Sequence, residues 1–377
     1  MSITQKVLIK DVLKDNSTKD LTNIAFKQKQ RNYGIDLLRM FSMINIINLH
    51  INLRGGLLRL KPNNVNYKEI WRLETFSYFP VDCFALISGI IGYNRYKFSN
   101  LIYLWFLTLF YSVSKHLYLY MQNRVKLKKL FFSFFPILIK FHWYVNAYFI
   151  MYLFLPFINF GIKSLNIKTF RNLVIFYVLF FSIYYIINAL FIKSDYNFLA
   201  GGYTSSWLTI LYIIGSYLGK YKLENIDKSS NKIKIFYFIN YIGVSFLSSE
   251  IFFITRKRFL ICYLSPTILS QAICLVIIFY TMKIKNKFLI KIIKFITPLV
   301  FSATLIHSIL FSFNLKIIVS LFDSLRELNI TFIFLKIYIL SIIIFIFCLV
   351  IDYIRSILFK IMKIREVCLY IERIIPN

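Results

Sequence analysis

Two ionisable side chains inside one apolar segment are the first residues that could do chemistry. The segment GIDLLRMFSMINIINLH, from Gly34 to His50, contains Arg39 and ends at His50, eleven positions later. Eleven residues turn an α-helix by about 1100°, close to three whole turns, and advance it by about 16 Å. Both side chains therefore lie on one face of a helix, near its opposite ends. An arginine at such a site suits phosphate binding, and a neutral histidine suits general-base catalysis.

Simpler interpretations exist for the charged groups of this segment. Arg39 is close enough to the start of the segment for its guanidinium to reach lipid head groups. Asp36 precedes Arg39 by three positions, so the two can pair on the helix surface, and a structural role for Asp36 is at least as well supported as a chemical one. A charge at the bilayer centre costs about 2.5–3.5 kcal/mol, so such residues normally face a bundle interior or a wet cavity. The shared face of Arg39 and His50 favours the cavity.

The composition of the chain is that of a membrane protein. Of its 377 residues 58% are hydrophobic and only 16% are charged, which is too apolar for a soluble protein. Repeated runs of about 20 apolar residues match the bilayer core, and continuous runs favour helices over barrel strands. We therefore predict an all-α fold, a polytopic membrane helical bundle of about ten transmembrane helices. The predicted spans are residues 34–52, 76–94, 100–121, 143–162, 172–192, 204–220, 235–254, 260–282, 294–313 and 331–354.

The basic residues set the orientation of the bundle. The net charge of +30 does not point to nucleic acid, because Lys and Arg separate the apolar runs instead of gathering in one domain. With the N-terminus inside, 27 of them lie on the inner side and 16 on the outer side, which favours two cytoplasmic termini. We expect a cytoplasmic lead at 1–33 with a surface helix around Val7–Leu13, a transmembrane domain at 34–354 and a cytoplasmic tail at 355–377. The segment Leu130–Ile139 is predicted to be interfacial or re-entrant.

The cysteines carry no sign of metal or disulfide chemistry. None of the five forms a CxxC pair, and no metal-ligand spacing appears, so we expect free thiols packed as small hydrophobes and no metal. They are Cys83, Cys262, Cys274, Cys348 and Cys368.

A carboxylate in the second predicted span is a candidate partner for His50. Asp82 lies near the outer end of that span, so Asp82 and His50 are expected to share a depth. An aspartate bonded to one ring nitrogen would fix the histidine tautomer and leave the other nitrogen as the base. Asp82 could equally cap its helix or face water. Ser88 and Gly89, two turns deeper, suit close helix packing.

Five segments, in order along the chain, carry motifs of one family. The segment IDLLRMFSMINIINLH resembles the Arg-x10-His signature in the first span of acyltransferase family 3, the multi-pass O-acyltransferases that modify sugars, polysaccharides and antibiotics. The similarity extends over roughly residues 30–315. Within the family, the segments most resemble those of bacterial sugar and surface-polysaccharide acetyltransferases. The other four segments are FPVDCFALISGIIGY (79–93), WYVNAYFIMYLFLPFIN (143–159), GGYTSSWLTILYIIGSYLGKY (201–221) and FSATLIHSIL (301–310).

The resemblance implies an O-acyltransferase of the cell membrane. Its donor would be cytoplasmic acyl-CoA, taken here as acetyl-CoA, and its acceptor a sugar hydroxyl of a cell-surface polysaccharide or lipid-linked precursor. Arg39, Arg95 and Lys97 are expected level with one another, where they could bind the phosphates of coenzyme A. Ordinary positive-inside loop charge explains Arg95 and Lys97 equally well. His50 would be the general base toward the acceptor hydroxyl, with transient acylation of His50 as a less favoured variant.

Further residues on the predicted outer side could meet a saccharide. Trp143, Tyr144 and Tyr148 suit stacking on a sugar, although an aromatic belt of any membrane protein has the same composition. Glu250 lies near the outer end of the seventh predicted span, where a carboxylate is costly and could touch the acceptor. His307 could assist proton transfer or be a buried histidine bonded to a neighbouring carbonyl.

The alternative function is a multi-pass transporter or flippase for lipid-linked saccharides, in which charged residues within spans are equally typical. Such proteins usually show repeat symmetry and helices broken by Gly or Pro. This chain has 11 Gly, 7 Pro and no clear repeat, so acyl transfer fits better. A polysaccharide polymerase, expected to have large outer loops, fits less well than either.

Overall fold

The structure is a computed structural model of the chain. It describes residues 31–94, 96–192, 199–226, 230–313 and 330–374. The expected surface helix at Val7–Leu13 and the candidate phosphate ligand Arg95 lie outside these residues. The chain divides into two compact units, Met1–Asn32 and Tyr33–Asn377, and every helix below belongs to the second.

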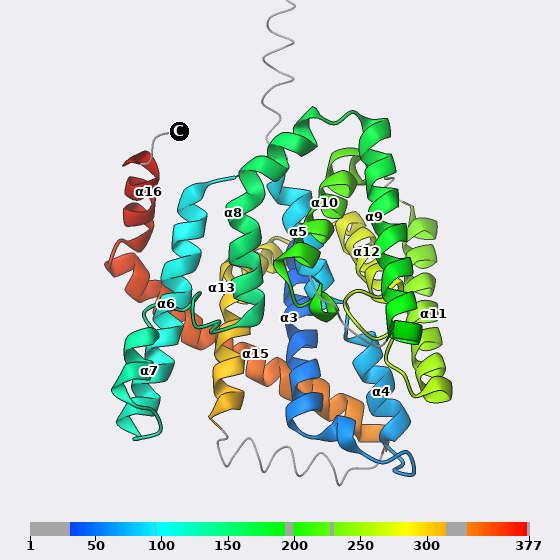
Figure 1. The fold of residues 1–377 in the computed structure, drawn as a ribbon, viewed down its shortest axis with the longest axis horizontal. Coiled ribbons are helices and arrows are strands. Elements are labelled where there is room, and N and C mark those ends of the chain that lie inside the picture. Colours follow the sequence, from blue (N-terminus) through cyan, green and yellow to red (C-terminus); the bar gives the residue numbers. More distant parts are fainter. Residues whose placement is uncertain (1–30, 95, 193–198, 227–229, 314–329, 375–377) are drawn as a thin grey trace, which may run out of the picture. The chain divides into compact units, whose positions relative to one another are not determined.

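The described part of the chain is all-α, and each of the ten predicted spans falls on a helix (Figure 1). The predicted fold class is therefore confirmed. The helices are α3 (Tyr33–Arg54), α4 (Tyr67–Phe76), α5 (Pro80–Gly92), α6 (Phe98–Met121), α7 (Leu127–Phe132), α8 (Trp143–Ser164), α9 (Ile167–Ile187), α10 (Ser205–Tyr217), α11 (Asn231–Thr255), α12 (Pro266–Thr281), α13 (Lys287–Ser312), α15 (Ile330–Ile361) and α16 (Ile364–Ile374).

Six helical stretches among the described residues are long and apolar enough to cross a bilayer. One of them, Tyr67–Gly92, joins α4 to α5 and begins nine residues before the predicted start at 76. The sequence YKEIWRLETF of α4 has four charged residues among ten, which is why its apolar content alone did not mark it as part of a span. The segment Leu130–Ile139, expected to be interfacial or re-entrant, comprises the second half of the six-residue α7 followed by turns, and α7 buries no residue.

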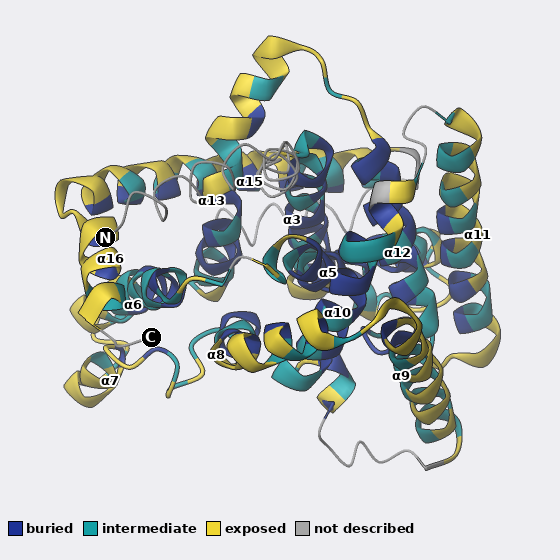
Figure 2. Ribbon diagram, turned by 90° about the horizontal axis from the view of Figure 1, so that it is seen from above, coloured by how far each residue is buried: buried dark blue, intermediate teal, exposed yellow. Residues whose placement is uncertain are grey.

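Burial separates a central set of helices from a lipid-facing set. Buried residues gather on α3, α5, α10 and α12, whereas α9, α11 and α15 present long exposed faces (Figure 2). Those exposed faces are apolar, as shown by Phe176 on α9, Phe236 on α11 and Ile343 on α15, each more than half exposed. A face of this kind is stable against hydrocarbon, so the chain is a multi-pass membrane protein.

The closest helix packing joins α5 to α10 through glycines. A Cβ added to Gly89 would run into the backbone carbonyl of Tyr212, and one added to Gly215 would run into that of Leu86. Small residues let helix backbones approach in this way, which confirms the packing role considered for Gly89. The close approach also lets the Ser216 hydroxyl donate a hydrogen bond to the Gly89 carbonyl over 3.3 Å.

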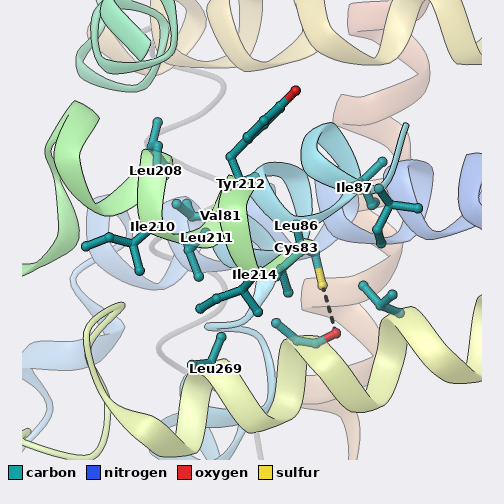
Figure 3. Close-up of a cluster of buried hydrophobic side chains, with 14 of the residues drawn as sticks. Val81, Cys83, Leu86, Ile87, Leu208, Ile210, Leu211, Tyr212, Ile214 and Leu269 are labelled. Carbon is teal, nitrogen blue, oxygen red and sulfur yellow. Dashed lines mark hydrogen bonds between the residues drawn. The ribbon is translucent and has the colours of Figure 1, made fainter. Parts of the chain in front are cut away.

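Apolar side chains surround this glycine contact. Figure 3 shows Val81, Leu86 and Ile87 of α5 interleaved with side chains of α10, and Leu269 of α12 closing the cluster. The Cys83 thiol donates to the Ala272 carbonyl of α12 over 3.7 Å, also drawn there. These contacts hold the second family-like segment in place beside α3.

We expect Gly89→Ala and Gly215→Ala to destabilise the protein by about 1–3 kcal/mol each, because the added methyl group overpacks the α5–α10 contact. The unfolding midpoint of the purified protein in detergent measures the effect. Gly243→Ala is the matched control, since a Cβ at Gly243 meets nothing within 4 Å and alanine favours a helix over glycine. Equal midpoints for Gly89→Ala and Gly243→Ala would contradict the packing role.

Candidate functional site

The candidate site follows one seam, between α3 and α13. His50 of α3 bonds to His307 of α13, and seven residues earlier Met43 accepts a hydrogen bond from the Thr304 hydroxyl over 3.6 Å. Residue numbers rise together along this seam, so the two helices run in the same direction. Arg39 and His50 both lie on α3, as predicted, about three helical turns apart.

His50 and His307 form a directed hydrogen-bonded pair. The His307 Nδ1 lies 2.5 Å from the Ala303 carbonyl oxygen, and its Nε2 lies 2.8 Å from the His50 Nδ1. A carbonyl can only accept, so the His307 Nδ1 carries the proton. With both rings neutral, as burial among apolar groups favours, the His307 Nε2 accepts and the His50 Nδ1 donates. The His50 Nε2 is then left with a lone pair.

The hydrogen bond from His307 to the Ala303 carbonyl is the one expected for a buried histidine, and the His307 side chain is fully buried. The bond to His50 was not anticipated from the sequence. The two residues are 257 positions apart, and no spacing rule connects them. The only signal was that each is a histidine in the outer half of a predicted span.

A third histidine borders this pair. The His142 Nε2 lies 3.2 Å from the Ser308 hydroxyl, which itself donates to the Thr304 carbonyl over 2.9 Å. Because the Ser308 hydroxyl already donates its proton to Thr304, it accepts the hydrogen bond from the His142 Nε2–H. His142 precedes α8, and burial lowers the pKa of its imidazole to about 3, so the ring is neutral. Its buried Nδ1 keeps a lone pair and has no hydrogen-bond partner among the described residues.

Asp82 does not lie at the depth of His50, so that expectation is wrong. The start of α5 lies level with Phe41, whose ring stacks on Phe79 with centroids 5.6 Å apart. Phe41 is nine residues before His50, about 14 Å along α3. Because α4 fills the outer part of this span, α5 begins deeper than expected. Asp82 is fully buried and accepts a hydrogen bond from the Trp207 indole over 3.3 Å.

Glu74 of α4 is the carboxylate that lies near the depth of His50. It is 5% exposed and accepts a hydrogen bond from the Asn52 amide over 2.9 Å. Asn52 is two positions after His50, a rotation of about 200°, so Glu74 meets the opposite face of α3. The contact therefore joins α4 to α3 and does not orient His50.

Arg39 lines a cavity of about 370 Å³, called here the Arg39 cavity. The Arg39 guanidinium bonds to the Asp36 carboxylate over 2.7 Å, which confirms the predicted pair, and keeps 26% of its side chain exposed. Four other helices contribute walls. The other lining residues are Phe84, Ser88, Asn100, Tyr103, Leu104, Leu107, Tyr144, Tyr148, Tyr152, Thr297, Pro298, Val300 and Phe301.

Three tyrosines of α8 form one wall of the Arg39 cavity. Tyr144, Tyr148 and Tyr152 recur every four residues, with neighbouring ring centroids 6.1 Å apart, and are called here the tyrosine ladder. The ladder begins two residues after His142 and ends at Tyr152, whose hydroxyl donates to the Lys97 carbonyl over 3.1 Å. Tyr144 and Tyr148 thus share a cavity with Arg39, although their position in the sequence predicts the outer surface.

The remaining predicted residues lie away from the Arg39 cavity. Trp143 packs on Tyr203, with ring centroids 4.5 Å apart. Lys97 precedes α6 with an exposed side chain. Glu250 accepts a hydrogen bond from Arg72 over 2.8 Å in a half-exposed ion cluster and does not belong to the cavity wall.

The part of the chain that the structure describes contains no group of three or more His, Cys, Asp or Glu side chains that could hold a metal ion. The five cysteines are free, and all but Cys262 are buried, as expected of small hydrophobes.

We expect the proton to sit on Nδ1 in both His50 and His307. Nitrogen-15 solid-state NMR distinguishes the tautomers, and the chain has only four histidines to label. His307→Gln and His50→Gln assign the two signals, and His116→Gln is the control because His116 bonds separately to the Ser112 carbonyl on α6. A His50 ring protonated on Nε2 alone would contradict the directed pair.

One comparison with known proteins gives a match. The family model described as an acyltransferase domain matches residues 32–353, which include α3, the tyrosine ladder and α13. No curated protein and no solved structure matches the chain. Since the family model covers most of the sequence, the chain belongs to acyltransferase family 3 and is a membrane acyltransferase.

Proposed function

We propose that the protein transfers an acetyl group from cytoplasmic acetyl-CoA to a hydroxyl of a sugar in a cell-surface polysaccharide or its lipid-linked precursor. The observation that carries this proposal is the seam of α3, with Arg39 in a cavity and the His50–His307 pair about 16 Å further along the same helix face.

The Arg39 cavity suits the donor. Arg39 offers a planar cation for a phosphate, with Asp36 holding one side of the guanidinium. The walls beyond it are apolar and aromatic, which suits an extended thioester arm. The tyrosine ladder runs along the cavity wall from the Lys97 end toward His142. A donor held by its phosphates at one end of the cavity would therefore direct its acyl group toward the histidines.

The histidine pair supplies the base. The acceptor hydroxyl gives its proton to the His50 Nε2 as its oxygen attacks the thioester carbonyl carbon. His307 accepts the hydrogen bond of the His50 Nδ1–H and so supports the charge that forms on His50, while Ala303 holds His307. When the C–S bond breaks, the thiolate of coenzyme A takes the proton from His50, and the acetyl ester is released. In this scheme His307 orients His50 and takes the place expected for Asp82.

The acceptor enters from the other end of the seam. Trp143, at the start of α8, lies next to His142 and packs with Tyr203 and Tyr263, which precede α10 and α12. Rings of this kind stack on sugars. The His142 Nδ1 lone pair is available to accept a hydrogen bond from a second hydroxyl of the acceptor.

We expect His50→Ala to lower kcat for acetyl-CoA consumption by about 10²–10⁴-fold, since it removes the general base. His307→Gln should give a smaller loss, because glutamine can still accept from His50. The assay follows acetyl-CoA consumption by purified protein and O-acetyl groups on surface glycans by mass spectrometry. His116→Ala is the control, a histidine on α6 outside the pair.

Unchanged acetyl-CoA turnover in a folded His50→Ala variant would contradict general-base catalysis by His50. A change in glycan export without consumption of acetyl-CoA would favour the flippase instead.

A further inference from the structure

The family model matches the chain up to residue 353, yet Arg355 and Arg365, beyond that point, contact residues that line the Arg39 cavity. Helix α16 lies beside α6 (Figure 1), and Arg355 of α15 reaches the same helix. From sequence, residues 355–377 are expected to form a cytoplasmic tail.

Arg355 fixes one wall residue of the cavity. It forms two hydrogen bonds to Asp352, of 2.6 and 2.9 Å, and donates a third over 2.8 Å to the hydroxyl of Tyr103. The Tyr111 hydroxyl donates to Asp352 over 2.7 Å. Arg355 and Asp352 are both buried, so each charge is matched inside the bundle.

Helix α16 is held firmly against the start of α6. Lys363, with φ of 51°, turns the chain sharply after α15. Ile364 and Cys368, one helical turn apart, are buried against Tyr103 and other apolar residues of α6. The Glu372 carboxylate accepts a hydrogen bond from the Ser99 backbone N–H over 3.1 Å, which satisfies a donor in the first turn of α6.

This docking brings the exposed Arg365 to the cavity rim. The Arg365 Nη2 donates to the Asn100 side-chain oxygen over 2.7 Å, and its guanidinium lies 5.5 Å from the centre of the Tyr103 ring. Asn100 and Tyr103 both line the Arg39 cavity. The bond to Asn100 uses one of five guanidinium N–H groups, which leaves a fork able to bind a phosphate.

We propose that Arg365 binds a phosphate group of acyl-CoA at the entrance of the Arg39 cavity, so that α16 is part of the donor site. The inference rests on the proposed function for the identity of the donor. Arg39 then meets the donor inside the cavity and Arg365 meets it at the rim, while Asn100 and Tyr103 hold the Arg365 guanidinium in place.

The test compares Arg365→Gln with the wild-type protein by calorimetric titration of coenzyme A in neutral detergent. We expect the Kd for coenzyme A to rise about tenfold or more, as for loss of a hydrogen-bonded charge contact, and the Kd for pantetheine, which lacks the phosphates, to stay the same. Arg373→Gln removes the same charge from the same helix about 12 Å further along and should change neither value. Arg365→Lys, which keeps the charge but loses the fork, should fall between.

An unchanged Kd for coenzyme A in Arg365→Gln would overturn the inference, as would an equal change for coenzyme A and pantetheine, which would mark Arg365 as a positioning residue only. An effect seen only in phosphatidylglycerol vesicles, and equal for both ligands, would assign the phosphate to lipid and overturn it too. If the wild type binds coenzyme A in an Arg365-dependent way but transfers no acetyl group, the proposed function fails and the inference stands. If the wild type binds no coenzyme A, both fail.

Discussion

The parallel packing of α3 and α13 is the constraint on which the rest of the site depends. Arg39 and His50 share one face of α3, but an enclosed site forms only where another helix packs against that face. Because α13 runs in the same direction as α3, its residues near Thr297 meet Arg39 and its residues near His307 meet His50. One seam therefore holds both Arg39 and the His50–His307 pair, at a separation set by the rise of the helix.

Lipid imposes a second condition, since polar groups inside the bundle must find partners within the protein. Four pairs among the described residues meet this condition in short networks: Asp36 with Arg39, Asn52 with Glu74, Trp207 with Asp82, and Asp352 with Arg355. Of these pairs, only the first reaches the Arg39 cavity directly. A carboxylate inside a predicted span is thus a weak indicator of catalysis, because joining helices requires the same groups.

The failed expectation for Asp82 has a specific physical origin. Depth was counted from the ends of apolar runs, and the charged, amphipathic α4 was left out of the second span. Including it moves Asp82 inward by about 14 Å relative to His50 and brings Glu74 to the outer level instead. The predicted location of the tyrosine ladder was wrong for a related reason. Its spacing of four residues was visible in the sequence, but which helices it faced was not.

The sequence by itself determined the class of the protein, the approximate positions of its helices and the alignment of Arg39 with His50, because these depend on composition and on the helical period alone. It also determined the Asp36–Arg39 pair, which is local. Only the tertiary structure decided that His307 is the partner of His50, that Asp82 accepts a hydrogen bond from Trp207, and that α16 reaches the rim of the Arg39 cavity. Those contacts join residues more than a hundred positions apart, and their geometry depends on how whole helices pack, which no local pattern encodes.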